Sequence, residues 1–278
     1  MKINQDRTIN EASGKVAVII PFYRDTLSHF EEIALLQCEK VLINYSKIAI
    51  KPQHLVLPQK AGIVSFNNVV NFDDKFFKGI QGYNALMLSD AFYKAFLDYE
   101  YILIYQLDAF VFKDELNYWC NQNYDYIGAP WLRRKGYKSL VKANAYELVY
   151  KWHRFFNLQK NGLPTEKQFY DQVGNGGFSL RRVRKFYDLA IELRTSAHDY
   201  LNKGGAMFNE DAFWSIEVNR KIKRLNIPDY KTGVKFSIEL QPERALELNA
   251  QQLPFGCHAW DLHLEFWRKV FSKYGYEI

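Results

Sequence analysis

Short apolar runs alternate with amphipathic segments along the first third of the chain. The run from Val16 to Pro21 is continuous and rich in β-branched residues, which predicts a strand buried on both faces of a sheet. Ser28 and Glu31 follow with capping-box spacing, and the apolar positions after them recur at helical intervals. Repetition of this order predicts an α/β fold with a doubly wound, mostly parallel sheet flanked by helices. The predicted strands are residues 16–21, 54–58, 68–72 and 101–108, and the predicted helices follow Ser28 and span residues 82–97.

The second half of the chain has a less regular pattern. Residues 132–170 are polar and aromatic without a clear period, which predicts an irregular insertion over the sheet. No segment resembles a flexible linker, so we expect a single domain over residues 1–278, with its core from about 16 to 260. The remaining predicted elements are a strand that ends in a turn at 124–131, a basic helix over 181–194, a helix that opens at 209–214 and a final helix over 261–273.

Composition and charge narrow the range of partners. The aromatic content of 17% is high, and we expect most of these residues in the core and a minority of Tyr and Trp in a binding site. A net charge of +6 favours anionic partners. Because no nucleic-acid-binding motif accompanies the charge, we expect no nucleic acid partner. Three basic runs are typical of solvated helix faces, but they also suit phosphates or an acidic membrane surface: residues 133–135, 181–185 and 220–224.

The cysteines and the first residues favour a cytoplasmic protein. Cys38, Cys120 and Cys257 are scattered without a C-x-x-C motif, so we expect neither a disulfide framework nor a cysteine zinc site. Residues 1–7 lack the apolar core of a signal peptide, and no apolar run has the length of a membrane span. Peripheral attachment to the inner face of a membrane stays open.

A charged residue, Asp108, closes one of the most apolar runs of the chain. Residues 101–107 read Tyr-Ile-Leu-Ile-Tyr-Gln-Leu, and a carboxylate placed at the end of such a strand is either costly or functional. In open α/β sheets the carboxyl ends of the strands face the crevice in which ligands bind. We therefore expect Asp108 to face a ligand, directly or through a cation.

Three further motifs carry candidate chemistry, and each also has a purely structural explanation. Asn209 is a favoured N-cap that would place Glu210 and Asp211 in a first helical turn, ionised at neutral pH, either as capping residues or as a general base. The glycine-rich residues 174–177 permit close approach of a ligand to the backbone, or simply form a turn. His258 lies between a glycine turn and a helix, as a ligand or as a structural histidine.

Taken together and in order, these motifs carry a family resemblance. They are Val18-Ile19-Ile20-Pro21-Phe22-Tyr23-Arg24, Tyr83-Asn84-Ala85, Gln106-Leu107-Asp108, Tyr126-Ile127-Gly128-Ala129-Pro130-Trp131, Gly174-Asn175-Gly176-Gly177-Phe178-Ser179-Leu180-Arg181, Glu210-Asp211-Ala212-Phe213-Trp214 and Phe255-Gly256-Cys257-His258. From about residue 16 to 258 the chain resembles GT-A-fold glycosyltransferases, and most closely a bacterial and fungal domain family of unassigned function related to them. The resemblance implies a GT-A, Rossmann-like sheet.

The resemblance also implies a role for each motif. In GT-A enzymes the nucleotide lies against the first strand and its turn, and a D-x-D motif binds a divalent cation with the donor diphosphate. Asp108 matches the second acid of that motif, Gln106 replaces the first, and His258 matches a carboxy-terminal metal ligand. Glu210 and Asp211 resemble the acidic pair that supplies the catalytic base, for which we favour Asp211. The implied donor-binding residues are Pro21, Phe22, Tyr23, Arg24, Asn84, Gln106, Asp108, Asn175, Gly176 and Gly177, and the implied metal ligands are Asp108 and His258.

We therefore expect a glycosyltransferase of the hexosyltransferase class. It would transfer a sugar with inversion from a uridine-linked nucleotide sugar to a glycan or lipid-linked acceptor, with Mn²⁺ or Mg²⁺ as cofactor. We expect acceptor contacts in residues 132–170. If no metal binds, the phosphates would be neutralised by Arg24, Lys78 or the pair Arg133 and Arg134.

Two alternatives remain open. A non-catalytic module that binds a sugar nucleotide or a glycan is favoured by Gln106 in place of an acid, whereas retention of Asp108, the acidic pair and His258 argues against it. A nucleotidyltransferase on a related sheet would need a glycine-rich loop after the first strand, which residues 21–26 do not supply.

Overall fold

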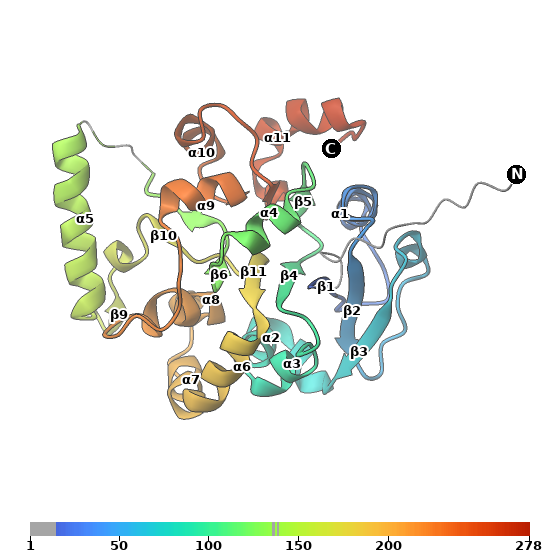
Figure 1. Cartoon of the computed structure of the whole chain (residues 1–278), viewed down its shortest axis with the longest axis horizontal. Helices are drawn as coiled ribbons and strands as arrows, with labels where there is room; N and C mark the ends of the chain where they lie inside the picture. Colours follow the sequence, from blue (N-terminus) through green and yellow to red (C-terminus); the bar gives the residue numbers. More distant parts are fainter. Residues whose placement is uncertain (1–14, 135–136, 138) are drawn as a thin grey trace, which may run out of the picture.

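The computed structural model describes residues 15–134, 137 and 139–278, and its centre is a six-stranded sheet (Figure 1). In order across the sheet the strands are β3 (Asn68–Phe72), β2 (Ser46–Pro52), β1 (Val16–Pro21), β4 (Tyr101–Tyr105), β11 (Phe178–Arg182) and β6 (Tyr126–Ile127). The first four strands in this order run parallel to one another, whereas β11 runs antiparallel to both β4 and β6. The prediction of a mostly parallel sheet flanked by helices is therefore confirmed, with one reversed strand.

Helices cover both faces of this sheet because its central strands are apolar on both sides. On β1, Val18 and Ile20 belong to a core shared with α1 (His29–Val41) and α4 (Leu116–Asn121). Ala17 and Ile19, which point the other way, belong to a second core with α2 (Gly79–Met87), α3 (Asp90–Lys94) and α6 (Val183–Glu192). The sheet is therefore the middle layer of three (Figure 1).

A smaller sheet continues from the end of β4. It has three strands in the order β12 (Ser237–Ile238), β13 (Gly256–Cys257) and β5 (Phe110–Val111). A third core, with Trp260, Trp267 and Phe271, packs against it. The remaining elements are β7 (Pro130–Trp131), α5 (Leu140–Phe155), β8 (Gln159–Lys160), β9 (Leu163–Pro164), β10 (Gln172–Val173), α7 (Arg194–Leu201), α8 (Glu210–Ala212), a π-helix (Phe213–Glu217), α9 (Tyr230–Phe236), α10 (Pro242–Leu248) and α11 (Leu264–Phe271).

Several local predictions are confirmed. β1 and β3 have the predicted bounds. The Ser28 hydroxyl accepts a hydrogen bond from the backbone N–H of Glu31, whose carboxylate accepts one from the N–H of Ser28, so the capping box is complete. All three cysteines are buried and free.

Two strand predictions are wrong. The second strand is Ser46–Pro52 rather than residues 54–58, which form a turn that leads into a 3₁₀ turn at Gln59–Ile63. Its apolar centre is only three residues long between lysines, so its pattern is weak, yet it is buried between β1 and β3. The strand predicted to reach Asp108 ends at Tyr105, because the chain turns there to enter the smaller sheet.

Three helix predictions and the prediction for the insertion also need correction. The helix over 82–97 is divided at Ser89, whose hydroxyl accepts a hydrogen bond from the N–H of Phe92 and so begins α3. The predicted basic helix over 181–194 begins only at Val183, because residues 178–182 pair as β11. The final helix is shorter, with 3₁₀ turns on either side of α11. The insertion predicted to be irregular contains α5, whose apolar residues recur at helical spacing among polar ones but mostly face solvent instead of the core.

Within the described ranges, no helix combines the length and the apolar character needed to cross a bilayer. Residues 1–7, for which we expect no signal peptide, and Lys135 of the first basic run lie outside the residues that the structure describes.

Candidate active site

The two sheets meet at a turn that carries Asp108. β4 ends at Tyr105, and the backbone N–H of Gln106 donates to the carbonyl of Gly177 beside it (2.9 Å). The N–H of Ala109 then donates to the carbonyl of Gln106 (2.9 Å), which closes the turn before β5 begins. Asp108 therefore lies at the carboxyl end of a central strand and faces the smaller sheet.

His258 lies at the centre of a cluster of polar side chains from both sheets. Its Nε2 atom is 3.1 Å from Oδ1 of Asp108 and 3.1 Å from Oε1 of Gln106. Its Nδ1 atom is 3.3 Å from Oε1 of Glu239 and 3.2 Å from Nδ2 of Asn175. The structure thus brings together residues that are more than a hundred positions apart in the sequence.

The charges of this cluster stabilise one another. Burial alone would lower the pKa of His258, but the carboxylates of Asp108 and Glu239 outweigh it and raise that pKa to about 10. Burial alone would raise the pKa of Asp108, whereas the His258 imidazolium holds it below its usual value. The protonated ring can donate to both carboxylates, one from each nitrogen.

Asn175 fixes the loop that faces this cluster. Its Oδ1 atom accepts hydrogen bonds from the backbone N–H groups of Gly177 (3.1 Å) and Phe178 (3.3 Å). Gly177 is packed tightly here, since a Cβ atom at this position would lie 2.0 Å from Nε2 of His258 and 2.6 Å from Oε1 of Gln106. The absence of a side chain at this position lets the strand pass against the cluster.

Gly177→Ala is therefore expected to displace His258 and Gln106 and to weaken ligand binding at this cluster by at least tenfold. The measurement is calorimetric titration of the variant with uridine diphosphate in the presence of Mn²⁺. Gly62→Ala is a suitable control, because a Cβ atom there meets no atom within 4 Å. Equal affinity in Gly177→Ala and wild type would show that no ligand group uses this cluster.

A second, fully buried cluster supports the neighbouring acidic pair. Arg181 on β11 forms a two-pronged ion pair with Glu210, with Nη2–Oε1 at 2.9 Å and Nη1–Oε2 at 3.1 Å. Arg181 also donates to the Tyr93 hydroxyl (3.0 Å) and to the Ser179 hydroxyl (3.1 Å). Glu210 is thus directed into the protein, and its charge is matched there.

Asn84 holds the Glu210 turn from the other side. Its Oδ1 atom accepts from the backbone N–H of Glu210 (3.2 Å), and its Nδ2 atom donates to Oδ1 of Asn209 (2.9 Å). Asn209 has the extended backbone of an N-cap, but its side chain bonds Asn84 and does not cap α8. Gly176 lets Glu210 approach, because a Cβ atom at Gly176 would lie 2.3 Å from Oε1 of Glu210.

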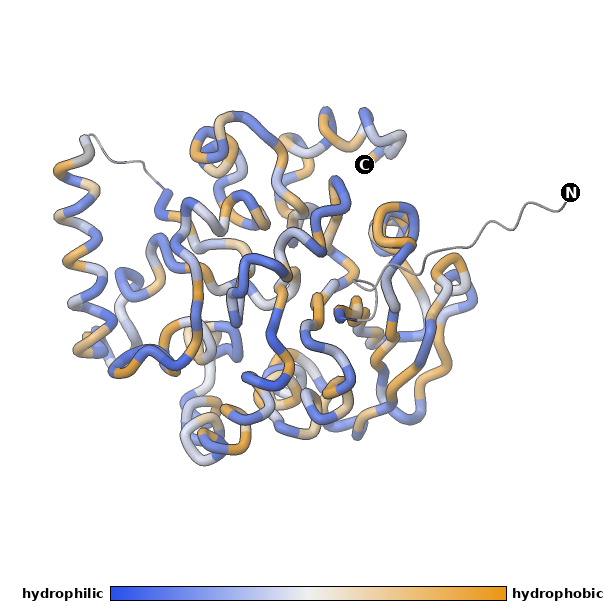
Figure 2. The backbone as a smooth tube through the Cα atoms, in the orientation of Figure 1, coloured by the Kyte–Doolittle hydropathy of each residue, from blue (hydrophilic) through white to orange (hydrophobic). Residues whose placement is uncertain are grey.

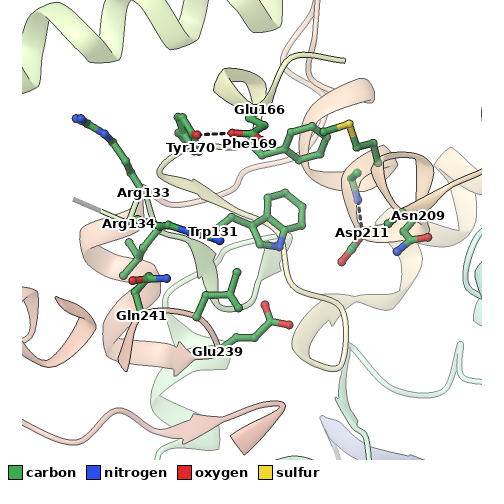
Figure 3. Close-up of a pocket in the computed structure, with 15 residues that line it drawn as sticks. Trp131, Arg133, Arg134, Glu166, Phe169, Tyr170, Asn209, Asp211, Glu239 and Gln241 are labelled. Atoms are coloured by element: carbon green, nitrogen blue, oxygen red, sulfur yellow. Dashed lines mark hydrogen bonds between the residues drawn. The ribbon is translucent and has the colours of Figure 1, made fainter. Parts of the chain in front are cut away.

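Asp211, the other member of the pair, lines a pocket of about 880 Å³. Figure 3 shows the carboxyl groups of Asp211 and Glu239 at the same cavity, with the Trp131 indole beside them. Phe169 and Tyr170, from the end of the insertion, form part of the wall. The pocket therefore combines two carboxylates with aromatic surface.

The protonation of Asp211 differs from the sequence-based expectation. Burial, the Glu210 carboxylate and the Glu239 carboxylate together raise the pKa of Asp211 to about 8. The prediction that both acids stay ionised at neutral pH is therefore wrong for Asp211. A carboxyl group with a pKa near the working pH is suited to accept a proton during a reaction.

Glu239 is a pocket residue that the sequence pattern does not reveal. It follows β12, whose two residues are too few to show a strand period, and β12 pairs with β13 so that Glu239 lies next to His258. Among the described residues, its buried Oε2 atom has no hydrogen-bond partner. An unpaired acceptor at the pocket is positioned to bind a hydroxyl or a cation.

The turn after β1 has two buried and two exposed side chains. Pro21 and Phe22 point into the core, so neither side chain faces solvent. Tyr23 and Arg24 are exposed. Arg24 donates to both carboxylate oxygens of Glu31 at 2.9 Å, which holds it against the start of α1.

Tyr23 packs edge to face against Tyr83, with ring centroids 5.7 Å apart. In the described part of the chain, the buried hydroxyl of Tyr83 has no hydrogen-bond partner. Burial raises the pKa of Tyr83 to about 12, so the phenol stays protonated and can donate to a ligand.

The other basic candidates lie in different places. Lys78 is exposed just before α2. The Arg133 guanidinium stacks on the rings of Tyr137 (5.1 Å) and Tyr146 (4.9 Å), whereas Arg134 is exposed at the rim of the pocket. Of the two adjacent arginines, Arg134 is the one without such a stacking partner among the described contacts.

The fold is that of the GT-A glycosyltransferases. A galactosyltransferase, LgtC, solved with donor and acceptor sugar analogues, is similar over 87% of this chain and 86% of its own, with a TM-score of 0.51 and 9% sequence identity. A core-mannan synthase A (CmsA/Ktr4) from Aspergillus fumigatus, in an Mn/GDP form, is similar over 82% of this chain and 74% of its own at 12% identity, but its TM-score of 0.44 is too low to relate the folds by itself. Among curated proteins there is no sequence match.

At the level of sequence families the assignment is direct. The chain belongs to the family described as "Protein of unknown function (DUF5672)", whose model matches residues 67–258. That match covers both clusters and the pocket, from Asn84 to His258.

Proposed function

We propose that this protein is a glycosyltransferase that transfers a sugar from a uridine-linked nucleotide sugar to a hydroxyl acceptor with inversion. The observation that carries the proposal is Asp211, a carboxyl group with a raised pKa on the wall of a pocket that adjoins the Asp108–His258 cluster. The GT-A fold supports it, since both features lie at the carboxyl end of the central strands, where such sheets bind ligands.

The donor would bind along the turn after β1 and the His258 cluster. Tyr23 and the Tyr83 hydroxyl offer a ring face and a hydrogen-bond donor for the nucleoside. Asn175, Gly176 and Gly177 form the stretch of backbone that would border the sugar.

The donor atoms near His258 fit a divalent cation. Asp108 and Gln106 each offer an oxygen 3.1 Å from Nε2 of His258. In the absence of a cation this ring is protonated, so Nε2 would have to release its proton to become a ligand, and nitrogen and oxygen ligands suit Mn²⁺ or Mg²⁺. Among the described residues, no three His, Cys, Asp or Glu side chains are grouped for a metal, so the amide of Gln106 would act as the third protein ligand. A bound cation would supply Lewis-acid charge to offset the negative charge that gathers on the departing diphosphate.

The acceptor would bind in the pocket lined by Asp211 and Glu239. Trp131, Phe169 and Tyr170 provide aromatic surface on which a sugar ring can stack. Asp211 would take the proton from the attacking hydroxyl, and Glu239 would orient that hydroxyl through its unpaired oxygen. Glu210, bound by Arg181, would position Asp211 rather than react.

Inversion is checked by proton NMR of the anomeric centre of the product, and a retained configuration would remove Asp211 from the role of base.

Titration with uridine diphosphate tests the donor site directly. Wild-type protein is expected to bind in the presence of Mn²⁺ and to lose most of its affinity in chelator. Asp108→Ala is expected to reduce the Mn²⁺-supported affinity by roughly tenfold or more, since one ligand of the cation is lost.

Asp188→Ala, on the exposed face of α6, makes the same change of charge away from the site and serves as the control. Equal wild-type affinity with and without Mn²⁺ would rule out the metal role of Asp108 and His258. It would leave the phosphates to Arg24, Lys78 or Arg134.

A binding module without catalysis is the second candidate, because Gln106 replaces an acid in the D-x-D position. This candidate predicts metal-supported binding of a uridine-linked sugar without hydrolysis of the donor, even on long incubation. Release of free sugar from the donor, detected by NMR, would decide for the enzyme.

A further inference from the structure

The helix α5 presents an apolar face to solvent. Residues 141, 145, 148, 149, 152, 155 and 156 recur at helical spacing and so lie on one side of the helix and its last turn. We call this surface the outer stripe; its large members are Val141, Leu148, Val149, Trp152, Phe155 and Phe156, and each is between 38% and 78% exposed. A contiguous apolar surface of this kind marks an interaction site.

The inner side of α5, in contrast, is attached by polar and aromatic contacts. Nδ1 of His153 lies 2.8 Å from the Thr165 hydroxyl, and Arg154 donates to the backbone carbonyl of Gln168 (3.3 Å). Tyr150 is buried against the ring of Tyr170, with centroids 5.5 Å apart. The inner side of α5 is thus held by polar groups and a buried tyrosine, whereas most of its large aliphatic side chains and Trp152 face outward, unlike in a usual surface helix.

Figure 1 shows α5 at the edge of the molecule, and Figure 2 shows hydrophobic positions recurring along it. The helix is amphipathic but is turned away from the protein that should receive its apolar side. Within the described residues, the large side chains of the outer stripe stay exposed.

Basic side chains surround the outer stripe. Lys142 and Lys151 lie on α5 at its two edges, one on each side. Nζ of Lys221 is 3.9 Å from the ring centroid of Phe155 and donates to the Phe155 carbonyl (2.6 Å). Ile222, which is exposed, and Lys223 follow directly. Nζ of Lys151 pairs with Oε1 of Glu147 at 2.8 Å, so the net positive charge beside the stripe comes from Lys142, Lys221 and Lys223. Lysines that border an apolar surface are suited to a layer of anionic headgroups.

The aromatic members also fit this environment. Trp152 and Phe156 pack together with ring centroids 4.3 Å apart, and bulky aromatic and aliphatic side chains enter the boundary between headgroups and acyl chains. Pairing of the stripe with a second copy across a two-fold axis would instead bring the flanking lysines of both copies together, which opposes such a dimer.

We propose that α5 docks this protein onto an anionic lipid bilayer, lying in the plane of the surface with its outer stripe among the acyl chains. Tyr170, against which Tyr150 of α5 packs, is also part of the pocket wall, so a docked chain holds that wall at the bilayer. The proposal stands independently of the sugar-transfer reaction.

Flotation of the full chain with lipid vesicles tests the proposal. The wild type is expected to float with vesicles of phosphatidylcholine that contain phosphatidylglycerol, and much less with vesicles of phosphatidylcholine alone or at high salt. The double variant Leu148→Gln with Trp152→Gln is expected to bind the anionic vesicles roughly tenfold more weakly or worse, because it removes two large members of the stripe.

Val56→Gln with Leu262→Gln makes the same kind of change at two other exposed positions and should bind like the wild type. Thermal unfolding of both double variants checks that the fold is retained. Failure of the wild type to float with anionic vesicles, or equal binding by the two double variants, would overturn the proposal.

Tryptophan fluorescence provides a second, local measurement. Trp152 is more than half exposed, whereas Trp119, Trp214, Trp260 and Trp267 are buried. Quenching by brominated lipid is therefore expected in the wild type and is expected to fall sharply in Trp152→Phe while flotation persists.

Sedimentation equilibrium tests pairing with a second copy. If the wild type dimerises with rising concentration but binds no vesicles, and the Leu148→Gln, Trp152→Gln double variant stays monomeric, the stripe belongs to a dimer interface and the proposal is contradicted.

Discussion

Asp211→Asn is expected to lower turnover roughly a thousandfold while uridine diphosphate binds as before, since loss of a general base affects the transition state far more than the ground state. The amide keeps the shape of the side chain and can still accept the hydrogen bond that Asp211 receives from the N–H of Ala212 (2.7 Å). The measurements are steady-state transfer or donor hydrolysis, together with calorimetric titration of uridine diphosphate. Asp188→Asn, on α6, is the matched control and should turn over like the wild type.

The pH dependence gives the same variant a second test. Since the reactive form of Asp211 is ionised and its pKa is about 8, kcat/KM of the wild type is expected to rise with pH and level off above about pH 8. A pKa raised by folding means that the folded state holds a proton that the unfolded state has already released. Stability is therefore lost as pH rises from the ordinary aspartate pKa through about 8. Asp211→Asn should remove that loss, and a wild-type activity independent of pH over this range would contradict the assignment.

Arg181→Met is expected to destabilise the protein by about 3–5 kcal/mol, because it leaves the buried carboxylate of Glu210 without its partner. Such a loss corresponds to a fall in Tm of about 10 °C for a chain of this size. Tm and the free energy of unfolding in urea measure it.

Replacing both residues of the ion pair should cost less stability than replacing Arg181 alone. Arg181→Met combined with Glu210→Met is expected to recover much of the stability, since no buried charge remains. Arg184→Met, which removes an exposed pair with Asp188, should cost less than about 1 kcal/mol. If Arg181→Met is no worse than Arg184→Met, the pair does not hold the acidic turn. Loss of turnover in the stable double variant would show that Glu210 positions Asp211.

The sequence predicts those parts of the fold where local pattern and tertiary burial agree. β1 is apolar on both faces and is buried on both, and the Ser28 capping box is complete within a few residues. The predicted helix over 181–194 includes the last two residues of β11, because Arg181 and Arg182 suggest a solvated helix face. In the structure Ser179 and Arg181 alternate with Phe178 and Leu180, and Arg181 is buried because Glu210 neutralises it. An ion pair formed by residues distant in sequence leaves no trace in the local pattern.

For the site, the sequence gives residues but not their partners. The sequence motifs indicate Asp108, His258 and Asp211, and the structure places the first two in one cluster and the third on the adjoining pocket. Glu239, which contacts His258 and lines the same pocket, follows a strand too short to be recognised. The raised pKa of Asp211 depends on Glu210 and Glu239 being near it, and only the folded chain shows that proximity.

The position of the site at the junction of two sheets has a consequence for synthesis of the protein. Every strand of the central sheet lies before Val183, so a chain still emerging from the ribosome can complete that sheet and the turn after β1. Glu239 and His258 belong to the smaller sheet, whose last two strands arrive near the carboxyl end. A nascent chain can therefore complete its central sheet well before Glu239 and His258 are made, and a chain that stops short of them lacks the cluster around His258.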